Sequence, residues 1–369
     1  MRDTPFLDRR TILGALGGLA AACWPLGGSA ATGPDLAVAS RRETGLRIYS
    51  NMADYNWREI LGGFRRRYPW IDVETLDMGP TEVFERYYAE TSARRRSADM
   101  IVSSAPDAWL RFLGRRGAAP YRSPQAAHLP AWSLPAPGLY TLSADPMLIV
   151  YNKALLDPAQ RPTGLRQLLT LAQANPRKFR NRITTYDASS HALAYAVHWT
   201  AIQQKRPGGW DLMQRIAPYV RVETGGATMM DKVTVGEYLV GYHVSAVTVL
   251  PQMLTRGRAK IVDWTLCADG TPVVLRGMAA TAAAQSPASA RLMLDYLLSR
   301  EGQIAAAKGG LTPYRPDVRE HEVPFLTHDA VVRRVGAANV VLVGYDPRMV
   351  AGYAAFIKGW NALFHRRRS

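Results

Sequence analysis

The stretch that decides the fold is Leu46-Arg47-Ile48-Tyr49-Ser50-Asn51-Met52-Ala53-Asp54-Tyr55-Asn56-Trp57. It begins as an apolar strand, passes through small and polar residues, and enters a helix. The apolar residues of that helix recur with helical spacing at Trp57, Ile60, Leu61 and Phe64. Open α/β sheets bind ligands at the carboxyl ends of their parallel strands. We therefore predict that Ser50 and Asn51 form one wall of a ligand cleft. Taken alone, the two residues fit an ordinary loop and helix cap better.

The same order of strand and helix continues along the chain. Residues 99–104 are a predicted strand that again ends in hydroxyl groups, those of Ser103 and Ser104. This alternation predicts an α/β fold with a parallel sheet. Further strands are predicted at 71–76, 147–151, 182–186, 220–222, 239–242 and 273–275. Helices are predicted at 81–93, 106–113, 165–174, from 192, near 231, at 287–299 and at 347–364. Residues 225–230 are expected to be a flexible loop.

A third polar turn follows the strand predicted at 182–186, and it contains Ser189, Ser190 and His191. Backbone N–H groups at the start of the next helix suit an anion. A plain N-cap explains the two serines equally well.

Length and composition suggest two domains, since the chain has 369 residues of which 47% are hydrophobic. The formal charge of +16 is compatible with nucleic acid, an anionic membrane or an anionic ligand. The positive residues are spread in short runs on predicted helix faces, so solvated surfaces explain them better. Common nucleotide-binding, zinc and serine-hydrolase motifs are missing from the sequence, and no cofactor is expected.

The first thirty-one residues are predicted to be an export signal of the twin-arginine type. Arg9-Arg10 precedes an apolar run too short to span a membrane, and small residues follow. Cleavage is expected near Ala30 or Ala31, while Cys23 is a poor lipoprotein site. The protein is then exported to the periplasm, where genomic DNA is not a partner. Residues 32–44 are expected to be a mobile leader.

The order of these segments resembles the periplasmic solute-binding proteins of ABC importers, in the branch that includes ferric-ion, organophosphate and thiamine binders. The resemblance covers nearly the whole mature chain. It is carried by Tyr49-Ser50-Asn51 with Phe64 to Val73, by Ala98 to Ser104, by Val150-Tyr151-Asn152 and by Pro287 to Gln303. It implies the two-lobe periplasmic-binding-protein fold of type II, with a ligand cleft between lobes joined by crossing strands. The first lobe is expected at 45–145 and 275–320, the second at 146–274. A helical segment at 321–369 is expected to pack on or near the second lobe.

The resemblance also implies a set of binding positions and partners. They are Ser50, Asn51, Ser103, Ser104, Ser189, Ser190, His191, Thr228 and Glu237. The two adjacent tyrosines of ferric binders correspond here to Ala246 and Val247, so free ferric ion is not expected. The predicted ligand is a small organic anion such as a phosphate ester or phosphonate. A monomer that delivers this ligand to the membrane permease is expected.

Three other functions remain open at this point. The protein can be a binder of ferric chelates, or a sensor subunit that presents its ligand to a membrane histidine kinase. The turn from Ser189 to His191 is also compatible with an exported hydrolase. We nevertheless expect that the protein is not an enzyme.

Overall fold

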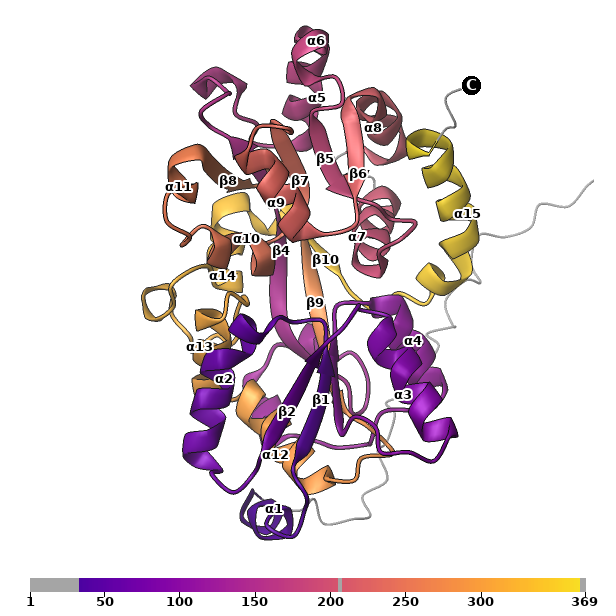
Figure 1. Ribbon diagram of the computed structural model, residues 1–369, viewed down its shortest axis with the longest axis vertical. Coiled ribbons are helices and arrows are strands. Elements are labelled where there is room, and N and C mark those ends of the chain that lie inside the picture. The colour runs from indigo at the N-terminus through magenta and orange to yellow at the C-terminus, as the bar shows by residue number, and fades with distance from the viewer. Residues whose placement is uncertain (1–32, 205–207, 366–369) are drawn as a thin grey trace, which may run out of the picture. The chain divides into compact units, whose positions relative to one another are not determined.

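The computed structural model describes residues 33–204 and 208–365, and the predicted export signal lies outside these residues. The described residues form one compact unit. Its strands build a mixed sheet in the order β2-β1-β3-β9-β4-β7-β5-β6, with β10 beside β9 and β8 beside β4. The predicted α/β architecture of two lobes joined by crossing strands is confirmed (Figure 1). None of the described helices has the length and apolar character needed to cross a membrane.

The first lobe contains the strands β1 to β3, which pair in parallel. Their side chains alternate between two apolar clusters. Ile48 and Met100 pack with the helices on one face, and Tyr49 and Ile101 pack with α3 and α4 on the other. The elements are β1 (Leu46–Ser50), α2 (Asp54–Arg67), β2 (Val73–Asp77), α3 (Glu82–Ser92), β3 (Met100–Ser103), α4 (Pro106–Gly114), α12 (Pro287–Leu298) and α13 (Arg300–Lys308).

The second lobe surrounds β5, which pairs in parallel with β6 and β7. A single large apolar cluster fills it and continues under the C-terminal segment. Its elements are α5 (Leu165–Ala174), α6 (Pro176–Phe179), β5 (Ile183–Tyr186), α7 (Ala192–Gln203), α8 (Gly209–Ile216), β6 (Val220–Glu223), α9 (Gly226–Thr234), β7 (Val240–Ser245), α10 (Ala246–Gln252), α11 (Arg258–Ile261) and β8 (Val262–Leu266).

Two long strands belong to both lobes, β4 (Tyr140–Asn152) and β9 (Thr271–Ala280). They run antiparallel to each other through the middle of the unit (Figure 1). The far end of β9 pairs with β3, while the far end of β4 pairs with β7 and β8. The lobe boundaries predicted near residues 145 and 274 therefore fall inside these strands, which are longer than the apolar runs in the sequence.

The start of the described chain differs from the prediction of a mobile leader. Gly33–Ser40 form the helix α1, whose Leu36 is only 2% exposed and packs in the first-lobe core. Glu43 then accepts hydrogen bonds from the backbone nitrogens of Ala288 and Ser289 at the start of α12. A carboxylate at a helix N-terminus satisfies free N–H groups, which ties this segment to the lobe.

The C-terminal segment is partly a strand and partly helical. β10 (Val340–Val343) extends the sheet beside β9, preceded by α14 (His328–Val335). The last helix, α15 (Arg348–Phe364), packs against α7 and β6 of the second lobe and also touches α4. Its Trp360 is fully buried and lies against the ring of His198. Short 3-10 helices η1 to η6 lie at 124–128, 131–133, 158–160, 217–219, 320–322 and 337–339.

Candidate functional site

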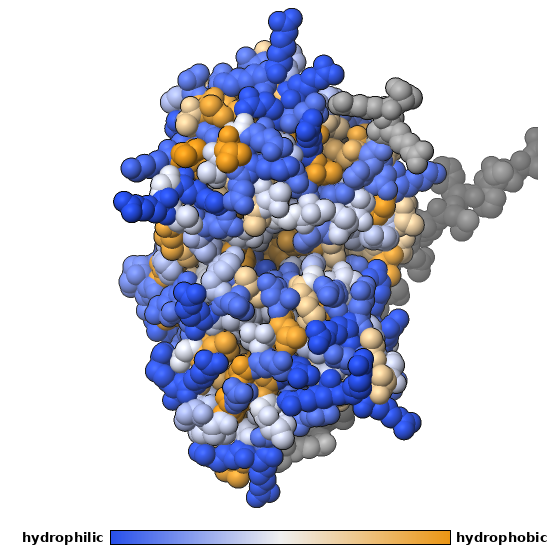
Figure 2. Space-filling model, in the orientation of Figure 1, coloured by the Kyte–Doolittle hydropathy of each residue, from blue (hydrophilic) through white to orange (hydrophobic). Residues whose placement is uncertain are grey.

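A cleft of about 280 Å³ lies where strand ends of the two lobes face each other. Figure 2 shows a largely hydrophilic face with a recess across its middle. Turns after β1 and β2 line the cleft from the first lobe, and the ends of β5 and β7 with the start of α9 line it from the second. This is the position where α/β sheets hold their ligands. The polar lining consists of Asn51, Tyr55, Asn56, Asp77, Tyr186, His191, Ser245, Thr248 and Arg276.

The floor of the cleft carries one guanidinium, that of Arg276 in β9. Its Nε donates to Oδ2 of Asp145 at 3.1 Å, and both side chains are almost completely buried. Its Nη1 donates to Oδ1 of Asn51 at 2.9 Å. No described residue accepts a hydrogen bond from Nη2, although Arg276 lines the cleft. A guanidinium has five N–H donors in a fixed arrangement. Nη2 can therefore donate to a ligand oxygen in the cleft.

The turn after β1 is tied to the turn after β3 through Asn51. The Asn51 amide nitrogen donates to Oγ of Ser104 at 2.8 Å, and its Oδ1 accepts from the Ser104 backbone nitrogen at 3.1 Å. The same Oδ1 accepts from Arg276. These reciprocal bonds hold the two strand ends together and fix the guanidinium beside them.

The mouth of the cleft is acidic on the first-lobe side. Asp77, the last residue of β2, is exposed there. Partial desolvation and the nearby charge of Asp54 raise its pKa, while Arg276 acts in the opposite direction. Desolvation also raises the pKa of Tyr55, which keeps its phenol protonated. The cleft thus presents a cation at its floor and hydrogen-bond acceptors at its mouth.

The second-lobe wall is made of neutral polar groups. Burial lowers the pKa of His191 to about 4, so its imidazole is uncharged near neutral pH. The buried Nδ1 of His191 has no partner among the described residues. Burial raises the pKa of Tyr186 to about 12, and the Tyr186 ring lies 5.1 Å from that of His191. Gly226 at the start of α9 is in close contact with the Tyr186 hydroxyl, and a Cβ there would lie 2.3 Å from it.

Two predicted first-lobe residues are buried behind the cleft rather than lining it. The Oγ of Ser50 accepts from Nε1 of Trp57 at 3.0 Å. The Oγ of Ser103 donates to the Pro80 carbonyl at 2.6 Å. Ser104 is outside the lining and hydrogen-bonds to Asn51, which is part of it. Of the first-lobe positions, Asn51 alone reaches the cleft directly.

The second-lobe positions divide in the same way. His191 lines the cleft, whereas Ser189 donates to Oδ1 of Asp187 at 2.8 Å. Ser190 and Thr228 are exposed outside the cleft lining. Glu237 is exposed outside the cleft lining too, and forms an ion pair with Lys232 at 3.3 Å. The Ser189 Oγ also lies 3.4 Å from Nε2 of His365, which in turn lies 3.0 Å from Oδ2 of Asp187. His365 is outside the cleft lining, and no described hydrogen bond joins Ser189 to His191.

Some residues of the cleft lining were not predicted, although the sequence contains patterns that indicate them. Arg276 interrupts the apolar run Val273-Val274-Leu275, and a charged residue inside a buried strand indicates a partner or a ligand. Ser245 and Asp77 are strand-end residues like those already selected. No group of three or more His, Cys, Asp or Glu side chains in the described residues is arranged to hold a metal ion.

Comparisons with known proteins agree with this geometry. The family model of bacterial extracellular solute-binding proteins matches residues 95–339. No curated protein matches the sequence. Among solved structures, the substrate-binding protein of an ABC transporter from Agrobacterium tumefaciens has a TM-score of 0.78 at 22% identity, covering 87% of this chain and 94% of that one.

Two further similar structures carry different ligands. The periplasmic binding protein AfuA from Actinobacillus pleuropneumoniae, with bound fructose-6-phosphate, has a TM-score of 0.64 at 17% identity and covers 88% of this chain and 99% of that one. Iron-bound HitA from Pseudomonas aeruginosa also has a TM-score of 0.64 at 17% identity, covering 86% and 99%. These likenesses confirm the predicted type II binding-protein fold.

Proposed function

Because the chain belongs to the family of bacterial extracellular solute-binding proteins, we propose that it is the periplasmic solute-binding component of an ABC importer. In this proposal the two lobes close on a small organic anion, and the closed form delivers it to the membrane permease. Closure is a population shift that the ligand drives through contacts made only when the lobes meet. The protein itself makes and breaks no bond.

The observation that carries the choice of an anion is Arg276. Its charge is held at the floor of the cleft by Asp145 and Asn51, so little rearrangement is needed when a ligand arrives. A carboxylate, phosphate or phosphonate oxygen accepts well from a guanidinium nitrogen that has no protein acceptor. The Asp145 carboxylate neutralises the buried charge before binding, which makes the empty cleft stable.

The acidic mouth suggests what the rest of the ligand carries. Asp77 repels a second anionic group but accepts hydrogen bonds from hydroxyl groups. The neutral His191 and the hydroxyls of Ser245 and Thr248 offer further polar contacts on the opposite wall. An anion with hydroxyl groups at its other end fits this distribution, which favours a phosphate ester such as a sugar phosphate over a simple dicarboxylate.

The positions that correspond to the tyrosines of ferric binders support the same preference. Val247 lines the cleft and Ala246 is buried beside it, so aliphatic side chains stand at these two positions. Fe³⁺ is a hard cation that prefers oxygen ligands, which neither side chain supplies.

A thermal-shift screen with sugar phosphates, phosphonates, thiamine and ferric citrate tests the proposal. A ligand at 100 times its Kd adds about 2.7 kcal/mol to the free energy of unfolding. We expect a hydroxylated phosphate ester to raise the melting temperature. A shift with ferric citrate alone would overturn the choice of ligand class.

Matched variants then test the site by calorimetry. Arg276→Gln is expected to weaken binding of the positive compound at least tenfold, and Arg276→Lys by less, since Lys keeps the charge without the fork. Arg215→Gln is the control, because Arg215 is exposed on α8, where it pairs with Asp211 at 3.7 Å and donates to Gln173 at 3.5 Å, and it does not line the cleft. Equal affinities for the wild type and Arg276→Gln would show that the anion binds elsewhere.

A further inference from the structure

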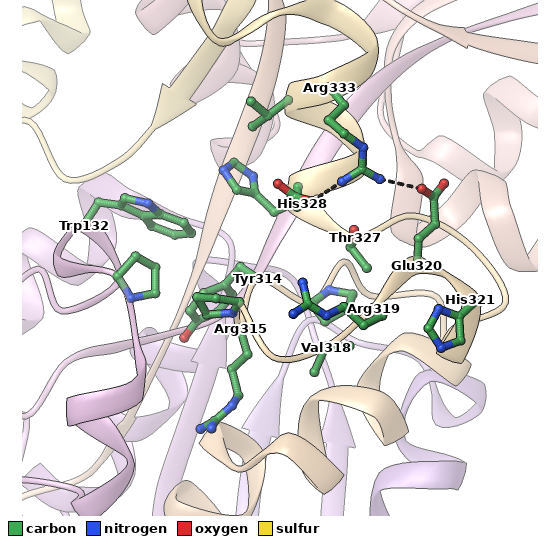
Figure 3. A pocket seen from close by; sticks show the side chains of 15 residues that line it. Trp132, Tyr314, Arg315, Val318, Arg319, Glu320, His321, Thr327, His328 and Arg333 are labelled. Atoms are coloured by element: carbon green, nitrogen blue, oxygen red, sulfur yellow. Dashed lines mark hydrogen bonds and ion pairs between the residues drawn. The ribbon is translucent and has the colours of Figure 1, made fainter.

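A second cavity has a volume of about 570 Å³ and shares no lining residue with the cleft between the lobes. Figure 3 shows that its walls come from three stretches of the chain: residues 130–132, 313–321 and 327–333. The second stretch links α13 to the C-terminal segment, and the third contains the first half of α14. The cavity therefore needs a separate explanation.

One wall is an aromatic cluster built around Trp132, whose ring plane is tilted by 51° to that of Tyr314 and by 57° to that of His328. The Trp132 ring lies 5.0 Å from that of Tyr314 and 5.1 Å from that of His328, measured between centroids. Tyr314 is buried, and its hydroxyl donates to the carbonyl of Thr141 in β4, which anchors this wall to the central sheet. Aromatic rings fixed in this way can form stacking and edge contacts with a planar ligand. Because the rings are already ordered, binding costs little side-chain entropy.

The charges around the cavity leave one cation without a counter-ion. Arg333 pairs with both Glu320 and Asp329. Arg319 lies exposed at the rim, and no described residue forms an ion pair with its guanidinium. Figure 3 shows Arg319 between Tyr314 and His321. An anionic group arriving there gains a partner without competing with an existing one.

A buried polar atom adds to this picture. The Nδ1 of His328, which lines the cavity, is buried without a partner among the described residues. Unpaired buried polar atoms are rare and unfavourable, so such an atom in a cavity wall is suited to a polar substituent of a guest. Val318 and Val332 supply apolar contacts elsewhere in the lining.

We propose that this cavity is a second binding site, which accepts a small planar aromatic carboxylate. The aromatic ring lies along Trp132, and the carboxylate pairs with Arg319. The volume falls in the range of small-molecule sites. The site does not depend on the ligand of the cleft and is tested separately from it.

The test uses the full mature protein labelled with 5-fluorotryptophan, with 2-naphthoate as the probe. Trp132→Phe identifies the ¹⁹F resonance of Trp132. Titration with 2-naphthoate is expected to shift this resonance saturably, whereas the uncharged 2-naphthamide shifts it with at least tenfold weaker affinity.

Variants then separate the site from the cleft and from general charge effects. Arg319→Met is expected to weaken 2-naphthoate binding about tenfold, while the other ¹⁹F resonances stay in place and report an intact fold. Two variants are expected to leave the titration unchanged. Arg215→Met replaces an exposed arginine that does not line this cavity, and Gly226→Ala alters the cleft between the lobes. The proposal is overturned if the Trp132 resonance does not move, if the amide binds as well as the acid, or if Arg319→Met binds as tightly as the wild type.

Discussion

Arg276 and Asp145 form an ion pair between the two strands that both lobes share, with Nε 3.1 Å from Oδ2. The carboxylate also accepts from the Ser143 hydroxyl and from the Thr312 backbone nitrogen. Every oxygen of Asp145 is thus satisfied by groups other than a ligand, and the guanidinium is oriented before a ligand arrives. This pair joins the two strands that both lobes share, at the floor of the cleft.

Removing the cation of this pair is expected to destabilise the protein. Arg276→Met leaves the Asp145 carboxylate buried and unpaired, and the free energy of unfolding should fall by about 3–5 kcal/mol. Asp145→Asn in the same chain removes the uncompensated charge while its amide keeps bonds to Ser143 and Thr312. Urea unfolding of the two single variants and the double variant measures these free energies. The explanation fails if the loss of unfolding free energy in the double variant equals the sum of the losses in the single variants.

Substitution of Gly226 is expected to affect the cleft through Tyr186. A Cβ at Gly226 would lie 2.3 Å from the Tyr186 hydroxyl, so Gly226→Ala forces this ring into the cleft or α9 away from it. We expect ligand affinity to fall about tenfold, which is 1.4 kcal/mol. Tyr186→Phe in the same chain should restore part of the loss.

The neighbouring Gly225 provides the control for that experiment. A Cβ on Gly225 would meet only the Thr228 hydroxyl, at an ordinary distance of 3.6 Å. Calorimetry with Gly225→Ala should give the wild-type affinity. An equal loss in both glycine variants would point to a general effect on α9 instead of the contact with Tyr186.

Two buried histidines predict how stability depends on pH. His243 is fully buried, neither ring nitrogen has a described partner, and burial lowers its pKa to about 4. Above the unfolded pKa of about 6.5 both states are neutral. As the pH falls below that value, the unfolded chain binds a proton that the native state does not, so stability falls by up to about 1.4 kcal/mol per pH unit. The pKa of His198 beside it is also lowered by burial, and adds to the effect.

The variant His243→Asn should reduce this acid sensitivity. His243 has a φ of 54°, a left-handed conformation that Asn tolerates better than most residues. Urea unfolding between about pH 7 and pH 5 should show a shallower loss of stability for the variant than for the wild type. His128→Asn, at an exposed position, is the control and should follow the wild type.

The last helix is expected to stabilise the second lobe through Trp360. Its Nε1 donates to Oδ1 of Asp187 at 2.9 Å, and its ring is buried against that of His198. Trp360→Phe should cost about 1–2 kcal/mol by leaving the carboxylate short of a donor, and Trp360→Ala about 3–5 kcal/mol by opening a cavity. His365→Ala removes a more exposed partner of Asp187 and should cost less than about 1 kcal/mol. Chemical unfolding ranks the three variants, and a different order would contradict this account.

The sequence predicts elements better than it predicts where side chains point. The strand at 46–50 and the helix from 54 to 67 follow from apolar spacing that the structure buries at Ile48, Trp57 and Phe64. The flexible loop predicted at 225–230 is instead the start of α9. Gly226 allows the helix to approach the Tyr186 hydroxyl closely and does not make the segment flexible. The sequence alone does not distinguish a glycine in a flexible loop from one at a close contact.

The strand-end rule predicts residues around the cleft, but of the predicted positions only Asn51 and His191 line it. Whether a hydroxyl faces a ligand depends on distant partners, such as Trp57 for Ser50 and Pro80 for Ser103. Arg276 was missed because the apolar residues before it already explained a strand. Its place at the floor of the cleft follows only from the pairing of β9 with β4, which brings Asp145 to it. The binding role of the predicted residues stays a prediction.

The central position of β9 has a consequence for how the chain is made. One edge of β3 is covered by β9, yet β3 ends at Ser103 and β9 begins at Thr271, so the whole second lobe is synthesised between them. Until then the nascent first lobe exposes an unpaired strand edge, which is open to wrong association. A ribosome-bound chain that stops before residue 271 should therefore depend on chaperones, and one that reaches α13 should not.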